Sequence, residues 1–526
     1  TGDPWFRLLA IEQDATALVA SGQTDAAEAL VLPALATCST TRLAFRCLRL
    51  AFVLGEHYLA TLRLSDARRA IGNGLVGARR AGEWFLEQQF LAQAATLEML
   101  ADDVSASTLP LARAYLGELV RRDARCATEQ WSRDELAMML LNREDVDGAR
   151  RELASAAACP GYEPGLLNLF ARAHVARDDE VAAVRARITA LRATSMTPGG
   201  QALLDQSEGM LLIGRDRATG VALLERAIAA SRATAASDID AHKARSYAYS
   251  TLILDAGRGG QWQRVWQLLG DEAGVAIARC GLGVAVEGRR SAVVVRDAEG
   301  AFAGAYDASR IGPEADAAHL VPAALRERLR GCAEVDVVAR PPVQGSPAVL
   351  PIELAWSYRS NGAAPGLGPP GRARLVISNV EPPAELGLPR LLPWHSASTP
   401  DVVLEGAAAT PSRALAELAG AGFIEIHAHG MVNAAVSDAA FLMLSPDPGG
   451  HYALTAAAIR KQPLRGRPIV VLAACRAGAT ASYRHEPWGL PAAFVEAGAR
   501  AVIASPDVIA DADAGAVFDA VSARIA

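Results

Sequence analysis

The spacing of apolar residues changes near residue 273, and this change constrains the fold more than any other feature of the sequence. Before it, apolar residues recur three and four positions apart, as in DAAEALVLPALATC (25–38) and TGVALLERAIAAS (219–231), which is typical of amphipathic helices. After it, short apolar runs alternate with helical segments, as in a parallel sheet covered by helices. We therefore predict an all-α part at residues 1–272 and an α/β part at residues 273–526.

Polar or glycine-containing breaks separate the predicted helices of the first part at a nearly regular interval. Breaks near residues 22, 63, 142, 177, 214 and 257 are in several cases 35 to 43 residues apart, a spacing typical of repeated helix hairpins. Segments 22–35 and 142–156 resemble the second helix of a tetratricopeptide repeat (TPR). We expect a TPR-like helical-repeat solenoid of at least five hairpins with a concave surface for a protein partner; an irregular all-helical domain is the alternative.

The second part changes pattern once more within itself. Residues 284–308 alternate apolar and polar positions around two turn signals, which predicts an antiparallel meander. The glycine- and proline-rich segment 360–372 is expected to be a loop or an internal linker. Beyond it, apolar runs and helical segments alternate, which predicts a mostly parallel sheet. The strands are expected at 334–340, 372–380, 423–429, 467–475 and 500–505, and the helices at 410–422, 454–462 and 490–499.

Composition excludes several classes of function. The net charge is −6 and the sequence has no basic stripe, so we expect no direct binding of nucleic acid. No apolar run approaches ~18 residues, and the amino-terminal residues lack the pattern of a signal peptide, so we expect no membrane association. The seven cysteines include no CxxC pair, which argues against disulfides and zinc. We expect six of them to be small core residues of a cytoplasmic protein and treat Cys475 separately.

Polar residues end two of the predicted strands. FIEIHAHG places His427 and His429 at one strand end, and IVVLAAC places Cys475 at another. Because reactive groups of a parallel sheet gather beyond the carboxyl ends of its strands, these residues are candidates for one active site. A thiol needs a base to become a nucleophile, and His429 could supply that base to Cys475. The backbone N–H groups of Gly430 and Cys475 could hold an oxyanion.

Other readings of these residues stay open. A cysteine that ends an apolar strand is commonly inert core, and a lone histidine is commonly a satisfied structural group. The two lie 46 residues apart, close to the separation of about 50 between histidine and cysteine in caspases. A metal-dependent hydrolase that uses His427 and His429 is a weaker alternative, because only His451 and His485 follow them.

The second part resembles a CHAT domain, a caspase-like cysteine peptidase module that occurs together with tetratricopeptide repeats. The similarity spans roughly residues 275–526. It rests on VLPIELA, LVISNV, LPRLLPW, GFIEIHAHG, IVVLAACRAG and EPWGLPAAFVEAGARAVIAS. The resemblance implies a thiol protease with a caspase-like fold in which His429 and Cys475 are catalytic and no cofactor or metal is required.

The resemblance also implies an acidic residue that selects a basic side chain before the cut bond. Asp507 is the first candidate, Asp511 and Asp513 follow, and Asp438 is a further candidate. The alternative is that the aspartates near 511 cap a helix that begins near residue 514. Here Pro506 and Asp507 stand where the family has Leu-Trp, and the chain ends about one element short of a complete family member, which is compatible with truncation or cleavage.

The resemblance extends to partners. Proteins with this pair of domains occur in bacterial defence, linked to CRISPR effector complexes and to gasdermin substrates. We expect a cytoplasmic hydrolase that cleaves a protein, such as a gasdermin or another defence effector, after a basic residue. An activating protein or ribonucleoprotein is expected to bind the TPR-like region. The alternative is a non-catalytic repeat scaffold with a degenerate caspase-like domain.

Overall fold

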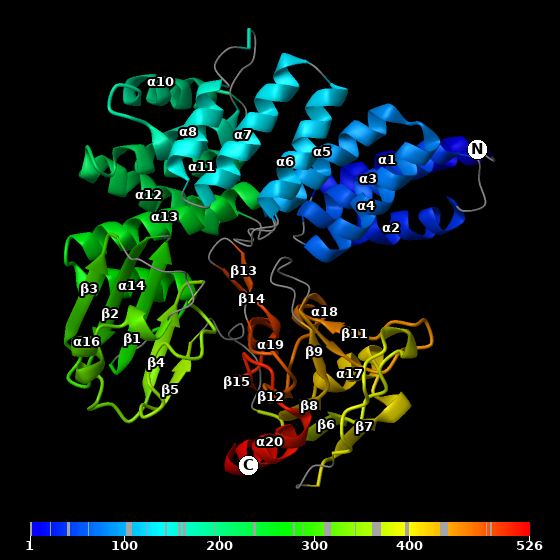
Figure 1. Cartoon of the computed structure of the whole chain (residues 1–526), viewed down its shortest axis with the longest axis vertical. Coiled ribbons are helices and arrows are strands. Elements are labelled where there is room, and N and C mark those ends of the chain that lie inside the picture. Colours follow the sequence, from blue (N-terminus) through cyan, green and yellow to red (C-terminus); the bar gives the residue numbers. More distant parts are fainter. Residues whose placement is uncertain are drawn as a thin grey trace. The chain divides into compact units, whose positions relative to one another are not determined.

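A computed structural model shows two compact units, residues Thr1–Leu252 and Ile253–Ala526 (Figure 1). Each unit is described by itself below. The predicted boundary between the all-α part and the α/β part, between residues 272 and 273, stays a prediction. The structure describes residues 3–21, 23–38, 43–60, 63–100, 108–123, 125–142, 145–155, 159–160, 165–194, 196–234, 238–276, 279–287, 289–309, 317–341, 343–359, 370–394, 399–431, 440–479, 481–483 and 486–525.

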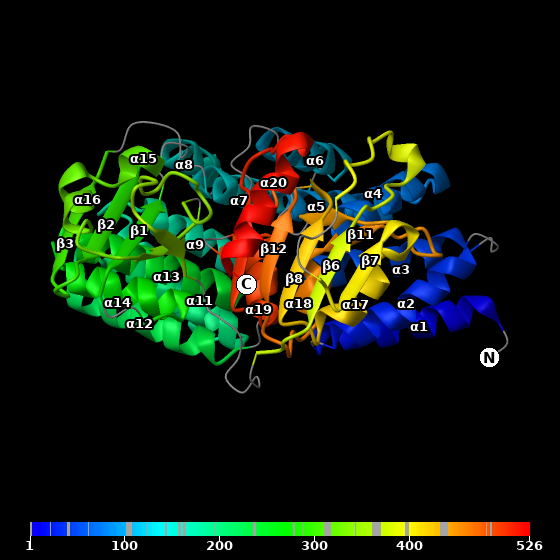
Figure 2. The ribbon, with the colours of Figure 1, turned by 90° about the horizontal axis from the view of Figure 1, so that it is seen from below.

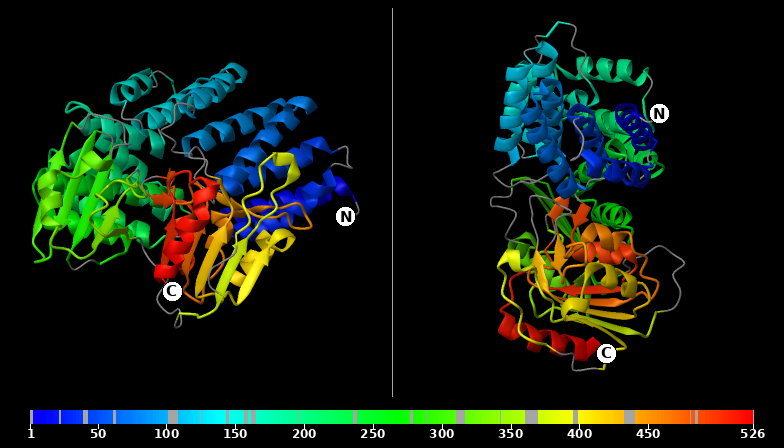
Figure 3. Two further views of the ribbon diagram at one scale, coloured as in Figure 1. Left: turned by 60° about the horizontal axis from the view of Figure 1, so that its bottom comes forward. Right: turned by 90° about the vertical axis from the view of Figure 1, so that its right-hand side faces the viewer.

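The first unit is a run of helices in which each helix from α1 to α12 packs against its neighbours along the chain. Helices with odd numbers also contact each other in sequence from α1 to α9, as expected for stacked hairpins. Together with the blue-to-green ribbon of Figure 3, this confirms the predicted all-α part. The helices are α1 (Pro4–Ala20), α2 (Thr24–Thr37), α3 (Ala44–Ala60), α4 (Leu64–Ala81), α5 (Trp84–Leu100), α6 (Thr108–Arg122), α7 (Cys126–Asn142), α8 (Val146–Ser155), α9 (Leu166–Val175), α10 (Val181–Arg192), α11 (Pro198–Leu212), α12 (Arg217–Arg232) and α13 (Ile239–Arg258).

Polar contacts join neighbouring helices of this unit. Arg46 donates to the buried carboxylate of Glu12 across 34 residues, and Asn168 donates to Asp134 across the same separation. The Gln88 amide donates to the Arg122 carbonyl, again across 34 residues. A tetratricopeptide repeat is about 34 residues long, whereas the odd-numbered helices from α1 to α9 begin 40 to 42 residues apart, so these contacts fasten neighbouring helices at places that are not equivalent in the repeat. The stacked hairpins agree with the TPR-like organisation predicted for this part.

The second unit contains a mixed five-stranded sheet in the order β3-β2-β1-β4-β5. The predicted meander is confirmed, because β1–β2 and β2–β3 are antiparallel pairs, while β4 and β5 add in parallel. Its elements are α14 (Trp262–Ala273), β1 (Gly281–Glu287), β2 (Arg290–Arg296), β3 (Phe302–Asp307), α15 (Ala317–Leu320), α16 (Ala323–Arg328), β4 (Val335–Ala339) and β5 (Trp356–Tyr358). The loop or linker predicted at 360–372 lies mostly outside the described residues.

A second sheet of this unit is wholly parallel, in the order β15-β12-β8-β6-β7, which confirms the predicted α/β fold (Figure 2). Its core on one side joins the even-numbered residues of β8, such as Ile424 and Ile426, to α17, α18 and α19. On the other side Val471 packs against Phe518 of α20, the red helix that runs along the sheet in Figure 3. The elements are β6 (Arg374–Ser378), β7 (Val402–Glu405), α17 (Pro411–Leu418), β8 (Phe423–His427), α18 (Ala456–Arg460), β12 (Ile469–Ala473), α19 (Leu490–Ala497), β15 (Ala501–Ala504) and α20 (Asp511–Ile525).

Two of the helices that cover this sheet, α17 and α18, are each preceded by a threonine that caps the helix. Thr410 precedes α17, and its hydroxyl accepts from the Arg413 N–H, while Pro411 occupies the first helical turn. Thr455 precedes α18 and accepts from the Ala458 N–H at 3.1 Å. A threonine side chain at this place satisfies a backbone N–H that has no partner within the helix. The turn chemistry therefore fixes where each crossover helix starts.

Short strands that the sequence did not predict complete the unit. A three-stranded sheet, β11-β10-β9, follows β8 directly, and a small antiparallel pair follows β12. They are β9 (His429–Met431), β10 (Phe441–Met443), β11 (Ala453–Thr455), β13 (Ala481–Tyr483) and β14 (Glu486–Trp488). The 3₁₀ segments are η3 (Ala384–Leu386) and η4 (Gly406–Ala408). Strands of three residues carry too few positions to show an alternating pattern.

The prediction that the cysteines form no disulfides is wrong. The structure pairs six of the seven, as Cys38–Cys47, Cys126–Cys159 and Cys280–Cys332. The chain brings these partners together across 9, 33 and 52 residues, separations that no local motif reveals. The cytoplasmic location, which rested on isolated thiols, stays a prediction. Among the described residues, no helix is long and apolar enough to cross a bilayer.

We expect iodoacetamide to modify a single cysteine of the denatured, unreduced chain. The physical reason is that six sulfur atoms are already bonded, which leaves the Cys475 thiol as the reactive one. Peptide mass spectrometry after alkylation, with and without prior reduction, measures this directly. Modification of any of the other six cysteines before reduction would contradict the corresponding disulfide.

Candidate active site

The site is built on the pairing of β8 with β12. The two strands are parallel, and their register runs from Ile469 beside Phe423 to Ala473 beside His427. Both strands therefore stop at the same edge of the sheet, and the chain leaves each strand there. His429 lies two residues beyond the end of β8, and Cys475 lies two residues beyond the end of β12. The two strand ends that the sequence predicts at one edge of the sheet do lie there, and the catalytic pairing of His429 with Cys475 stays a prediction.

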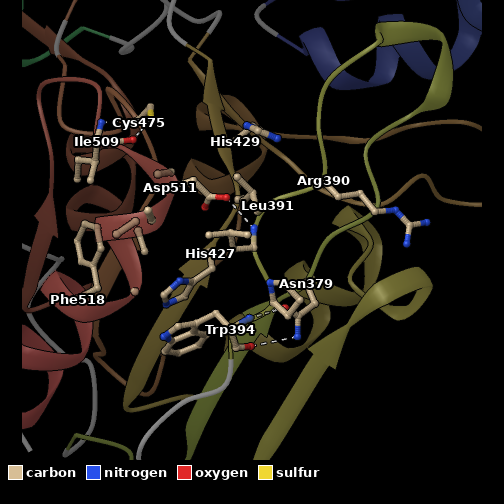
Figure 4. A pocket seen from close by; sticks show the side chains of 18 of the residues that line it. Asn379, Arg390, Leu391, Trp394, His427, His429, Cys475, Ile509, Asp511 and Phe518 are labelled. Carbon is tan, nitrogen blue, oxygen red and sulfur yellow. Dashed lines mark hydrogen bonds between the residues drawn. The ribbon is translucent and has the colours of Figure 1, made fainter.

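His429 and Cys475 line one pocket of about 380 Å³ (Figure 4). One wall is the segment Pro389–Trp394, which we call the strap, and the opposite wall is the start of α20 with Ile509 before it. Ala428, Ala473 and Ala474 add small side chains between the two walls. The lining of the pocket is therefore mostly apolar.

The side chain of His429 has a defined partner. Its Nε2 lies 2.9 Å from the carbonyl oxygen of Pro389. A carbonyl oxygen only accepts hydrogen bonds, so Nε2 carries the proton and donates it. The neutral ring then has its lone pair on Nδ1, where it is able to take a proton from another group. The contact with Pro389 thus selects the tautomer of His429 and its ring orientation.

Cys475 occupies a turn that begins directly after β12, and its side chain is partly buried. Its thiol donates to the carbonyl oxygen of Ile509 at 3.4 Å, and the Ile509 N–H donates to the sulfur at the same distance. The next residue, Arg476, has a φ of 54°, in the left-handed region that non-glycine residues seldom occupy. The turn therefore directs the thiol toward the pocket wall formed by Ile509.

Gly430 permits the close passage of the histidine segment over the cysteine turn. A Cβ atom at residue 430 would lie 2.0 Å from the carbonyl oxygen of Cys475. Only glycine allows the two backbones to approach so closely without displacing one of them. The predicted roles of the Gly430 and Cys475 N–H groups in holding an oxyanion stay predictions.

A buried carboxylate lies beneath the site on the α20 side of β8. Glu425 is fully buried, and its carboxylate accepts from Arg374 at 2.9 Å, from the Ser522 hydroxyl at 3.0 Å and from the His427 Nε2–H at 3.3 Å. Burial by itself raises the pKa of Glu425, but the hydrogen bonds from His427, Ser522 and Arg374 outweigh it and hold the pKa below its usual value. Glu425 is therefore charged and joins β8 to β6 and α20.

His427 and His429 face different surroundings, although one residue separates them. The buried ring of His427 stacks on Trp394 with 3.4 Å between ring centres, whereas His429 contacts Pro389 (Figure 4). In the part of the chain that the structure describes, no group of three or more histidine, cysteine, aspartate or glutamate side chains is arranged to hold a metal ion. The observed partner of His427 is the carboxylate of Glu425.

The candidate specificity residues lie in different places. Asp511 lines the pocket, and its carboxylate accepts from the backbone N–H of Leu392 at 2.7 Å. Asp507 is exposed, does not line the pocket, and takes part in the cysteine turn through its backbone carbonyl, which accepts from the Arg476 N–H. Asp438 lies outside the described residues. The selector role of each stays a prediction.

Several residues of the site were not singled out from the sequence. Glu425 shares its face of β8 with His427, so the two-residue period of a strand was the signal that could have identified it. Pro389 and Trp394 belong to a segment noted only as a point of resemblance, and no pattern predicted their contacts with histidines 40 and 33 residues away.

We expect Glu425→Gln to lower stability at neutral pH by about 3 kcal/mol, the usual cost of removing one member of a buried ion pair. Because the folded pKa of Glu425 lies below its unfolded value, its contribution is complete above the unfolded value of 4.5 and is lost as the pH falls through the folded pKa. Thermal unfolding from about pH 7 down to about pH 2 measures both effects.

The difference in melting temperature between the wild type and Glu425→Gln should narrow as the pH falls below about 4.5. The exposed Glu417, on α17, provides a matched control, and Glu417→Gln should leave the melting curve nearly unchanged at every pH. A penalty for Glu425→Gln that stays constant down to the lowest pH would show that Glu425 is not charged in the folded protein.

Comparison with known families places these observations in context. Residues 373–520 match the family model of the CHAT domain. The match covers the whole parallel sheet, the strap, His429, Cys475 and most of α20, whereas the first sheet lies before it. No curated protein shows significant similarity to the chain. The parallel sheet with its histidine and cysteine at adjacent strand ends is therefore a CHAT domain, related to the caspase-like peptidases, and a helical-repeat region precedes it in the chain.

Proposed function

We propose that the protein is a cysteine endopeptidase in which His429 and Cys475 form the catalytic pair. The observation that carries the proposal is their position: both follow paired strands at the same distance and line one pocket inside the CHAT domain. A caspase-like relationship raises the expectation of peptidase chemistry, and the pocket supplies a place where a peptide can reach both side chains.

In the proposed mechanism, Nδ1 of His429 takes the proton of the Cys475 thiol, and the sulfur attacks the scissile carbonyl carbon. The hydrogen bond that Nε2 of His429 donates to the Pro389 carbonyl supports this step, because it leaves Nδ1 as the acceptor. The Ile509 N–H, which donates to the sulfur, favours negative charge on it. Backbone N–H groups of Gly430 and Cys475 stabilise the oxyanion. His429 then protonates the leaving amine, and water hydrolyses the acyl-enzyme.

The substrate is a protein that is cut after a basic residue. Asp511 is the one carboxylate among the described residues that line the pocket, and Leu391, Leu392 and Phe518 supply apolar surface for the stem of a long side chain. A guanidinium or ammonium group at Asp511 gains a charge-assisted hydrogen bond, which a neutral side chain does not provide. Asp507 remains the alternative selector, which would require its exposed side chain to face a bound peptide.

The helical region extends the proposal to control of the enzyme. Stacked helix hairpins offer a long surface that suits a protein or ribonucleoprotein partner, and we propose that such a partner activates the cytoplasmic protease. By resemblance to proteins with the same pair of domains, the setting is bacterial defence, with a gasdermin or another defence effector as substrate. The competing function is a repeat scaffold whose CHAT domain has lost activity.

We expect Cys475→Ala to abolish peptide cleavage and His429→Ala to slow alkylation of Cys475 at neutral pH by at least about tenfold, because the thiolate then loses its base. Cleavage of a fluorogenic peptide library and the iodoacetamide rate of the full chain measure these effects. The exposed His451 offers a matched control, and His451→Ala should leave the rate unchanged. Equal rates of Cys475 alkylation in the wild type and in His429→Ala would favour the non-catalytic scaffold function.

Asp511→Asn separates charge from hydrogen bonding, because the amide oxygen still accepts from the Leu392 N–H. If the charge selects the substrate, this variant should lose about ten- to a hundredfold in cleavage after Arg while cleavage after Leu changes little. Asp507→Asn serves as the companion variant, measured by kcat/KM on the same peptides. A loss of cleavage after Arg that is confined to Asp507→Asn would assign selection to Asp507. A preference of the wild type for Asp or apolar residues before the cut bond would reject both aspartates as selectors.

A further inference from the structure

The strap, residues Pro389–Trp394, has little apolar burial to hold it in place. Leu392 is 57% exposed, and Pro389 and Pro393 are also exposed. Arg390 is 75% exposed at its side chain and, among the described residues, its ion pair is with the partly exposed Glu381. Because only Leu391 and Trp394 of the strap are partly buried, its position depends in part on polar contacts. The position of the Pro389 carbonyl, which orients His429, therefore depends on those contacts.

The polar contacts concentrate at the Trp394 end of the strap. Asn379, which follows β6 directly, donates from Nδ2 to the Trp394 carbonyl at 3.1 Å and accepts the Trp394 N–H on Oδ1 at 2.9 Å (Figure 4). One side chain thus holds both backbone groups of one residue. The indole N–H donates to Asp519 of α20 at 3.1 Å, and the ring stacks on His427.

Asn379 carries a backbone conformation that suits this function. Its φ is 50°, in the left-handed region that asparagine enters more readily than other residues with a side chain. The Nδ2 group also donates to the exposed Glu405 of β7 at 3.2 Å. The end of a core strand therefore presents an amide to the strap rather than to the interior of the sheet.

We propose that Asn379 is a positioning residue for the catalytic histidine. By holding both backbone groups of Trp394, it fixes the strap so that the Pro389 carbonyl meets Nε2 of His429 and keeps the proton there. Asn379 touches neither His429 nor Cys475 directly and acts through the four residues between Trp394 and Pro389. The inference rests on the proposed function, because it assumes that His429 acts as the base for Cys475.

The experiment measures alkylation of Cys475 by iodoacetamide in the full chain at neutral pH. Asn379→Gly removes the amide while keeping a residue that tolerates a positive φ, so backbone strain does not enter the result. We expect the rate to fall about tenfold, because misplacing a catalytic group by a small distance costs one to two orders of magnitude. Glu405→Ala, which removes only the contact to β7, should keep the wild-type rate.

A double-mutant cycle shows whether Asn379 acts through His429. In a His429→Ala background, Asn379→Gly should change the rate less than twofold, since the oriented ring is already absent. An equal tenfold loss in both backgrounds, or no loss in the wild-type background, would overturn the inference while leaving the proposed function intact. If His429→Ala alone leaves the rate unchanged, the proposed function fails and this inference fails with it.

A second variant covers the case in which Asn379→Gly does not fold, as judged by circular dichroism. Trp394→Phe keeps an aromatic ring that stacks on His427 but removes the indole N–H that donates to Asp519. We expect an intermediate loss of about threefold, again confined to the background that retains His429. A wild-type rate for Trp394→Phe, in a chain where Asn379→Gly cannot be measured, would also count against the inference.

Discussion

The parallel register of β8 and β12 is the constraint on which the site depends. Five residue pairs set it, and the apolar side chains of Ile424, Ile426, Val470 and Leu472 hold it by facing one common core. A slip by one residue would turn each of those side chains to the opposite face and would offset the strand ends by about 3.3 Å. The core therefore determines how the histidine and cysteine segments meet.

The two faces of this sheet contribute differently to the site. The face toward α17, α18 and α19 is dry and apolar, and it provides a rigid base. The face toward α20 includes the charged Glu425, which costs desolvation energy and is retained with Arg374, Ser522 and His427 as partners. This arrangement ties β8 to β6 and α20 by directional bonds, which fix relative positions more specifically than apolar contact does.

The sequence predicted the elements whose residues form a pattern long enough to read. Segment 469–473 is a continuous apolar run, and segment 423–427 alternates apolar residues with Glu425 and His427; both lie between turn signals, so their strands and their shared edge followed directly. The strap could not be predicted in this way, because its contacts join Pro389 to His429 across 40 residues and Leu392 to Asp511 across 119. Disulfide partners were missed for the same reason, since pairing depends on tertiary distance.

The energetics of the strap explain why single polar contacts matter there. Ordering six residues costs roughly 6 to 9 kcal/mol, and the fixed φ of Pro389 and Pro393 lowers that figure. The strap makes five hydrogen bonds, to His429, Asp511, Asp519 and twice to Asn379. At about 1 kcal/mol for neutral bonds and about 2 for those to carboxylates, they supply about 7 kcal/mol. The hydrogen bonds thus offset much of the ordering cost, the stacking of Trp394 on His427 adds to them, and each bond helps to decide where the carbonyl that orients the histidine lies.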